Sequence, residues 1–184
     1  MKHQIKPLTL LAFLILTACQ QKDTIAIENF KKELIGAWES AEMEKEGASY
    51  SHKELMLTDS TWHLAVYAYA DTLGHSPLFK LEFEGAYEIT DASNIVEGSW
   101  NGTYGIDKKH LTLLNRDAEI MNSLGFAPCG LVYGERTDVS NGCSFIQPIA
   151  DCPSDYDLIT IKEGMLYAGE RNPNMCEPTG RPQS

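Results

Sequence analysis

Cysteine is the residue of this sequence with the clearest chemistry, and Cys19 stands apart from the other cysteines by its setting. It follows residues 16–18, Leu-Thr-Ala, which is typical of the lipobox at which a peptidase cuts before a lipid-bearing cysteine. A basic start with Lys2 and Lys6 and an apolar run over 8–16 come before it. That run is about half of the ~20 residues that a transmembrane helix needs. We therefore expect residues 1–18 to be a secretory signal peptide and Cys19 to be the site of lipid attachment.

The four later cysteines, Cys129, Cys143, Cys152 and Cys176, form an even set. In an oxidising compartment such a set predicts two disulfides, with three pairings that sequence alone does not separate. Among these we expect Cys129–Cys143 to close a loop and Cys152–Cys176 to tie the tail to the last hairpin. Metal binding is the weaker interpretation, because there is no CxxC pair and the histidines show no ligand spacing. We predict no metal and no cofactor.

Catalytic motifs such as Gly-Xaa-Ser-Xaa-Gly, His-Glu-Xaa-Xaa-His or a phosphate-binding glycine loop do not occur in the sequence. Glu42, Glu44 and Glu46 alternate, which is more typical of the wet face of a strand than of a catalytic carboxylate cluster. His63 shares a face with Tyr67 and is interpreted as a surface or hydrogen-bonded histidine. The sequence therefore predicts a protein that is not an enzyme.

Length and charge bound the organisation of the chain. The formal charge is −11 over 184 residues, and removal of residues 1–18 with Lys2 and Lys6 would make it about −13. An acidic chain without a Lys/Arg cluster is repelled by phosphates, which argues against nucleic-acid binding. We expect residues 19–27 to be a tether and residues 28–184 to form a single domain.

From Gly36 onward the dominant hydrophobic period is two, which predicts strands with one dry face. A hairpin is expected around the turn at 58–60, a half-buried strand over 79–87, a strand over 96–104 and a final hairpin over 156–168. A short helical turn is expected over 28–34 and a helix over 115–124, with Asn115 as N-cap and Gly125 after its end. About eight strands with one short helix predict a mainly β fold, an antiparallel barrel or half-barrel.

Apolar and aromatic side chains on the dry faces of these strands are the candidates for ligand binding. A small barrel fills its interior with such side chains, whereas a wider one holds a small apolar ligand among them. The sequence is compatible with both a filled barrel and a barrel that holds a ligand. The candidates are Trp38, Trp62, Leu64, Val66, Phe79, Leu81, Phe83, Trp100 and Tyr104.

Several short segments share their order and spacing with one family. They are Gly36-Ala37-Trp38-Glu39-Ser40, Tyr69-Ala70-Asp71, Val96-Glu97-Gly98, Cys129-Gly130, Gly142-Cys143, Tyr156-Asp157-Leu158, Leu166-Tyr167-Ala168-Gly169 and Pro178-Thr179-Gly180-Arg181-Pro182. By these the sequence, from about 36 to 181, resembles the adenomatosis polyposis coli down-regulated domain family. Animal members of that family are membrane-anchored extracellular inhibitors of Wnt signalling. In contrast to members of the family, this chain has no cysteine at Met43 or near Gly74, which matches the loss of one disulfide.

The resemblance implies a lipocalin-like barrel whose apolar cavity takes an acyl chain. A bacterial-type lipoprotein has no Wnt to bind, so only the cavity and its lipid preference are carried over. We therefore expect a non-catalytic protein that binds a fatty acid or another lipid, with a lipidated protein as a further partner class. The expected location is the bacterial cell envelope, as an outer-membrane lipoprotein held through its acyl anchor, with display on the cell surface as one alternative. The rival hypotheses are a surface adhesion or structural module with a filled barrel, and an enzyme built in the loops.

Overall fold

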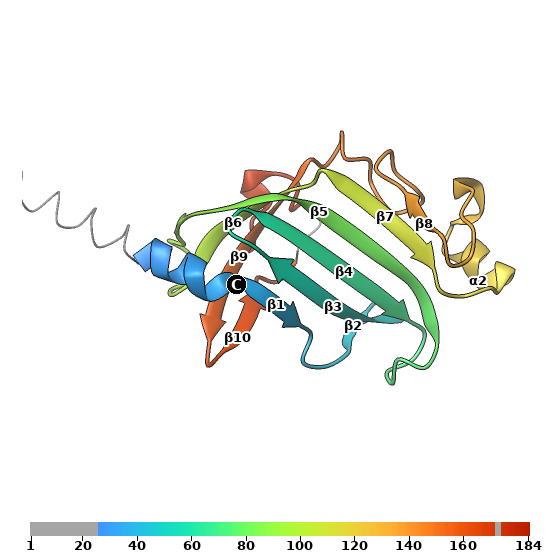
Figure 1. The fold of residues 1–184 in the computed structure, drawn as a ribbon, viewed down its shortest axis with the longest axis horizontal. Coiled ribbons are helices and arrows are strands. Elements are labelled where there is room, and N and C mark those ends of the chain that lie inside the picture. The colour runs from blue at the N-terminus through green and yellow to red at the C-terminus, as the bar shows by residue number, and fades with distance from the viewer. Residues whose placement is uncertain (1–25, 172–173) are drawn as a thin grey trace, which may run out of the picture.

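A ten-stranded antiparallel sheet forms the body of the protein and curls into a nearly closed barrel (Figure 1). The structure, a computed structural model, describes residues 26–171 and 174–184, so the predicted signal peptide and Cys19 lie outside the described residues. Along the main path the strand order is β1-β3-β4-β5-β6-β9-β10. The mainly β, barrel-like fold predicted from the sequence is confirmed. No helix among the described residues is long and apolar enough to cross a membrane.

The strands are short except for β3, β4, β5 and β9, and β2, β7 and β8 lie off the main path. Their bounds are β1 Gly36–Glu39, β2 Glu44–Glu46, β3 Ser49–Leu57, β4 Thr61–Tyr69, β5 Pro77–Ala92, β6 Trp100–Gly105, β7 Lys108–Leu113, β8 Arg136–Asp138, β9 Ser154–Lys162 and β10 Met165–Ala168. The predicted hairpins correspond to β3–β4 and β9–β10. In the turn of the second hairpin Glu163 and Gly164 both have positive φ, which matches the twist of the flanking strands.

β5 bends where the barrel closes, and so belongs to both halves of the sheet. Its first part pairs with β4 and β7 and its last part with β6. Between β6 and β7 the N–H of Asp107 donates to the backbone oxygen of Glu84, which keeps the chain against β5. A Cβ on Gly85 would collide with the backbone oxygen of Gly105, so the close approach at this bend requires glycine.

A helix over 26–34 packs against one end of the barrel (Figure 1). Its buried residues are Phe30 and Leu34, four positions apart as an amphipathic helix requires. The Phe30 ring stacks on Trp100 at 5.3 Å, and the indole N–H of Trp38 donates to the Leu34 oxygen at 2.8 Å. The predicted helical turns over 28–34 are confirmed, and they bring an apolar cluster to this end of the barrel.

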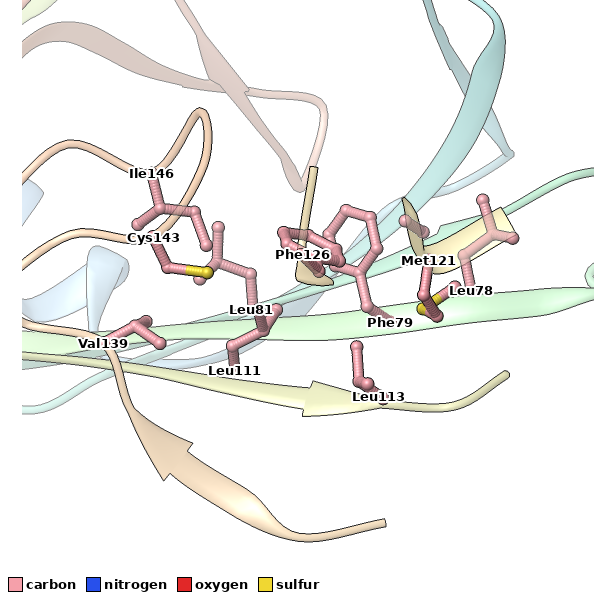
Figure 2. Close-up of a cluster of buried hydrophobic side chains, with 11 residues drawn as sticks. Leu78, Phe79, Leu81, Leu111, Leu113, Met121, Phe126, Val139, Cys143 and Ile146 are labelled. Atoms are coloured by element: carbon pink, nitrogen blue, oxygen red, sulfur yellow. The ribbon is translucent and has the colours of Figure 1, made fainter. Parts of the chain in front are cut away.

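The segment after β7 packs against the inward face of β5 and β7 near the other end of the barrel (Figures 1 and 2). The helix α2 (Ala118–Ser123) is shorter than predicted, and its N-cap is Asp117 rather than Asn115. Asp117 accepts from the N–H groups of residues 119 and 120, while the Asn115 side chain instead accepts from the N–H of Asp117. Phe126 then meets Phe79 edge to face at 5.3 Å. This segment forms a second apolar cluster.

Both expected disulfides are present. Cys129–Cys143 closes the loop after α2, and Cys152–Cys176 joins the start of the last hairpin to the C-terminal tail. The pairing predicted from the sequence is therefore confirmed.

The strand predicted over 96–104 begins only at Trp100, which corrects that expectation. The Ser93 hydroxyl accepts from the N–H groups of Ile95 and Val96, which folds residues 93–99 into a turn. Gly98, at φ +79°, lies within that turn. The apolar residues Val96 and Trp100 keep the even spacing of a strand across this turn, although residues 96–99 are not part of the strand.

The outward face of β4 and β5 carries a compact ion-pair cluster around Glu82. Glu82 is only 7% exposed, although the alternation places it on the outward face as predicted. Its carboxylate lies 3.1 Å from Nε of Arg136, 3.2 Å from Nζ of Lys80 and 3.4 Å from Nε2 of His63. Burial opposes ionisation, but the hydrogen bonds and charges of Lys80 and Arg136 lower the pKa of Glu82 below its ordinary value. His63 is thus a partner in this cluster, in agreement with its expected structural role.

Candidate functional site

The nine inward-facing residues predicted to bind a ligand divide into two groups in the structure. Trp62, Phe79, Leu81 and Tyr104 are buried in the two apolar clusters. The other five remain half-buried, and these are Trp38, Leu64, Val66, Phe83 and Trp100. Phe83 packs against both clusters, so it marks the place on the sheet where they meet.

Strand register places Leu64 and Phe83 in one row with two residues absent from the sequence prediction. Leu55 on β3 pairs with Leu64 on β4, and Leu64 pairs with Phe83 on β5. Phe83 in turn pairs with Lys109 on β7. Cross-strand partners share a face, so these four side chains lie side by side on the inward face. We call them the central row, and its three apolar members are all half-buried.

The next row along the sheet also ends on a lysine, at the opposite edge. Here Lys53 on β3 pairs with Val66, Val66 with Leu81, and Leu81 with Leu111 on β7. Leu81 and Leu111 are buried against the cluster near α2, whereas Val66 is half-buried and belongs to neither cluster. Val66 thus extends the half-buried apolar surface of Leu55, Leu64 and Phe83, and we call these four residues the floor.

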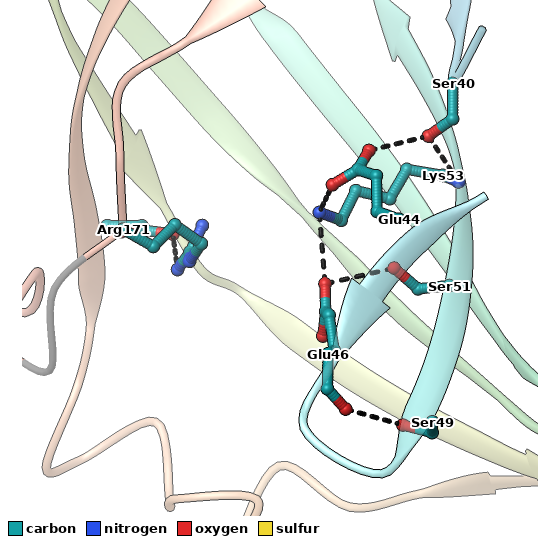
Figure 3. A network of polar contacts seen from close by, with 8 residues as sticks. Ser40, Glu44, Glu46, Ser49, Ser51, Lys53 and Arg171 are labelled. Carbon is teal, nitrogen blue, oxygen red and sulfur yellow. Dashed lines mark hydrogen bonds and ion pairs between the residues drawn. The ribbon is translucent and has the colours of Figure 1, made fainter. Parts of the chain in front are cut away.

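Lys53 is held in a polar network with β2 (Figure 3). Its Nζ lies 2.6 Å from Glu44 and 3.1 Å from Glu46, and the Ser51 hydroxyl donates to Glu46 at 3.0 Å. Burial opposes the charges, but the ion pair prevails: the pKa of Lys53 is raised and that of Glu44 is lowered. Lys53 therefore has its counter-charges within the protein.

Lys109 has no ion-pair partner of this kind in the part of the chain that the structure describes. Its side chain is 3% exposed, and its Nζ donates to the backbone oxygen of Gln147 at 2.8 Å. Nζ also lies over the Phe83 ring, 5.9 Å from the centroid. Within the described residues no carboxylate oxygen lies within 4.0 Å of it. Burial lowers the pKa of Lys109, and the negative charge of Asp155 opposes this only in part.

Asp155 and Asp157 project from β9 on the same face as Tyr104, which is buried inside the barrel. Asp155 accepts from Nη2 of Arg171 at 2.7 Å, while its Oδ1 is buried without a hydrogen-bond partner in the described structure. Asp157 accepts from the N–H groups of Leu158 and Gly169. The interior thus combines apolar floor residues with a few charged groups.

Two hollows are among those that indent the described surface. One of about 430 Å³ lies beside α2 and is lined by Leu113, Met121, Phe126, Leu131, Tyr133 and Arg116 among others. The other, of about 490 Å³, lies at the β1–β3 edge and is lined by Ala37, Trp38, Glu39, Glu54, Leu55, Met56 and His63. Trp38 and Leu55 of the second hollow are also inward-facing residues of their strands.

Lys109 is the charged residue of the central row that sequence reasoning missed. Its signal was present, because Lys109, Leu111 and Leu113 alternate and so share one face of β7. Lys53 carried the same signal, because Lys53, Leu55 and Leu57 alternate on β3. The exposed Arg171 gave none, since it reaches Asp155 only through the path of the tail.

One comparison with known families bears on the chain. A family model described as adenomatosis polyposis coli down-regulated 1 matches residues 14–145. This range contains β1 to β8, the central row and the Cys129–Cys143 disulfide, and it ends before β9. No curated protein matches the chain.

Proposed function

The chain belongs to the adenomatosis polyposis coli down-regulated 1 family, and from this premise we propose that it binds the acyl chain of a lipid on the inward face of its barrel, without catalysis. The observation that carries the proposal is the half-buried apolar floor formed by Leu55, Leu64, Phe83 and Val66. Apolar side chains inside a barrel are normally covered by one another. These four are incompletely covered, although Leu55, Leu64 and Phe83 also pack against the apolar cluster beside the helix over 26–34.

An acyl chain suits this floor better than a polar ligand. Apolar surface removed from water is worth about 25 cal/mol per Å², and the floor offers that surface from three adjacent strands. The Phe83 ring and the branched side chains present no hydrogen-bonding group to a ligand. A flexible hydrocarbon chain can follow such a surface across the strands.

The proposal includes anchoring at Cys19 in a bacterial outer membrane. Two features of the sequence support this location: the lipobox that ends at Cys19, and the basic and apolar signal-like segment that precedes the lipobox. The lipids of that membrane would then be the nearest source of a ligand, and a lipidated protein a second one.

A structural or adhesion module is the second candidate, and one observation favours it. Both ends of the barrel are filled by buried side chains, among them Leu34 at 0% and Phe126 at 2% exposure. A barrel of this kind is stable without a ligand, and its loops would then make the contacts.

Charge placed on the floor separates the two candidates. We expect Val66→Glu or Phe83→Glu to reduce binding of a fluorescent fatty acid at least tenfold, because a carboxylate next to a bound hydrocarbon chain loses its water. Since both positions are half-buried, the new carboxylate reaches water in the free protein and the domain still unfolds cooperatively. Binding is measured by titration of the fluorescent fatty acid, and folding by thermal melting followed by circular dichroism.

Met56→Glu is the matched control, because Met56 is 48% exposed on the outward face of β3. It should leave binding unchanged. Loss of binding in Met56→Glu alone would instead place the acyl chain in the hollow at the β1–β3 edge. Absence of binding by the unsubstituted protein, together with collapse of the fold in both floor variants, would favour the structural module.

A further inference from the structure

We propose that the bound lipid carries a free carboxylate head, which pairs with the ammonium group of Lys109 while its acyl chain lies on the floor over Phe83 and Leu64. The inference rests on the proposed function and specifies the ligand class. It follows from the position and the partners of Lys109.

A buried ammonium group without a counter-charge is costly unless something compensates it. The ammonium of Lys109 has three protons to donate, and the structure gives one acceptor, the Gln147 oxygen. Its remaining contact is with the face of the Phe83 ring. An anionic group that reached Nζ would supply both the missing charge and the missing acceptor.

Lys109 borders the floor on which the acyl chain is proposed to lie. Phe83 is its direct cross-strand partner, and Leu64 and Leu55 follow in the same row. A head group at Nζ therefore leads directly into a half-buried hydrocarbon surface. The geometry matches a molecule with one polar end and one long apolar chain.

The other interior charges already have partners in the protein. Lys53 is paired with Glu44 and Glu46, and Asp155 is paired with the exposed Arg171. The Asp157 carboxylate accepts from two backbone N–H groups. Lys109 is thus the cation in the described interior that is left for a ligand.

A carboxylate fits this position better than a phosphate monoester. One unpaired ammonium balances one unit of negative charge, whereas a phosphate monoester carries about 1.5 to 2 near neutral pH. The charge of Asp155 acts on Lys109, and its buried Oδ1 has no hydrogen-bond partner in the described structure. That carboxylate repels any anionic head, and the repulsion is larger for a phosphate because it carries more negative charge.

Competition between lipids of identical chain length tests the head group. The full-length protein, solubilised in a non-ionic detergent, is incubated with equimolar oleate, oleyl alcohol and oleoyl lysophosphatidate, and adducts are counted by native mass spectrometry. We expect oleate to be preferred over oleyl alcohol by about tenfold, as for a charge-assisted hydrogen bond, and over the lysophosphatidate as well. Lys109→Met should remove the preference for oleate and retain binding of oleyl alcohol.

Lys108→Met is the matched control, because Lys108 is the preceding residue of β7, is exposed and pairs with Glu84. It should keep the preference of the unsubstituted protein. Equal binding of oleate and oleyl alcohol by the unsubstituted protein would overturn the inference and leave acyl binding intact. Preference for the lysophosphatidate would contradict the carboxylate head and would indicate a phosphate head in its place. Absence of every adduct would contradict the proposed function itself, and these outcomes hold even if Lys109→Met does not fold.

Discussion

The indole N–H of Trp62 donates to the backbone oxygen of Gly105 at 2.7 Å and so joins β4 to β6 across the bend of β5. The Trp62 ring also meets Tyr104 edge to face at 5.2 Å. Since β4 and β6 are not paired with each other along the sheet, this side chain connects two strands that lie on either side of β5. Trp62 is therefore expected to stabilise the closure of the barrel rather than to line open space.

Trp62→Phe should lower the free energy of unfolding by about 1–3 kcal/mol, because the Gly105 oxygen loses a buried donor. Urea denaturation followed by tryptophan fluorescence measures the change. Trp100→Phe is the control, since the Trp100 indole N–H makes no hydrogen bond within the described residues while its ring also packs in the same cluster. An equal loss in the two variants would mean that the hydrogen bond contributes nothing beyond ring packing.

Cys19→Ser should abolish lipid attachment, because the thiol is the acceptor that the lipobox presents. We expect a precursor or soluble form in place of a membrane-bound protein. Metabolic labelling with radioactive palmitate measures the attachment. Label on the Cys19→Ser protein would contradict the prediction.

Removal of the Cys152–Cys176 disulfide by serine at both positions should destabilise the domain by about 3 kcal/mol, the chain-entropy value for a loop of this size. The tail should also become accessible to proteases, although Arg181 still donates to the backbone oxygens of Gly102 and Asp157. Limited proteolysis and urea denaturation measure the two effects. An unchanged urea midpoint would show that removal of this disulfide does not raise the conformational entropy of the unfolded chain enough to destabilise the domain.

Asp157 gives the domain a pH dependence of stability. Burial raises the pKa of Asp157 from 3.8 to about 6, with repulsion from Asp155 adding to the effect and the N–H groups of Leu158 and Gly169 opposing it. The native state therefore holds this proton more tightly than the unfolded chain. The resulting stabilisation is complete below about pH 4 and is lost as the pH rises through 6.

Asp157→Asn removes this titration while its side-chain oxygen can still accept the two hydrogen bonds. Relative to the variant, the unsubstituted protein should lose up to about 3 kcal/mol of stability between pH 4 and pH 7. The difference in unfolding free energy between the two proteins, measured in urea across this range, isolates Asp157 from the other acidic groups. A difference that does not change with pH would show that Asp157 has an ordinary pKa in the folded protein.

Much of the fold could be predicted because alternation is a local property. The inside and outside of β4 and β5 follow from every second residue, and the turns at 58–60 and 162–164 fix their hairpins. The N-cap of α2 and the start of β6 were predicted wrongly. Asn115 and Asp117 are both good capping residues, and only the path of the chain decides between them.

The candidate site was predicted only in part, since alternation tells which residues share a face but not which strands are neighbours. Leu64, Val66 and Phe83 were placed inward correctly. These three side chains are half-buried, whereas Phe79 and Leu81 are buried. This difference in burial depends on where the segment after β7 packs, which no local sequence pattern encodes. The lysine at the end of the central row required the pairing of β5 with β7.

The helix at one end of the barrel limits how far the domain can move if Cys19 bears the anchor. Cys19 precedes Ala26, the first described residue of that helix, by seven positions. Seven residues span at most about 25 Å even when fully extended. With so short a connection the barrel would remain beside the bilayer that holds its anchor, with the helix end facing that bilayer. The barrel would then exchange lipid with this bilayer and could not carry the lipid to another membrane.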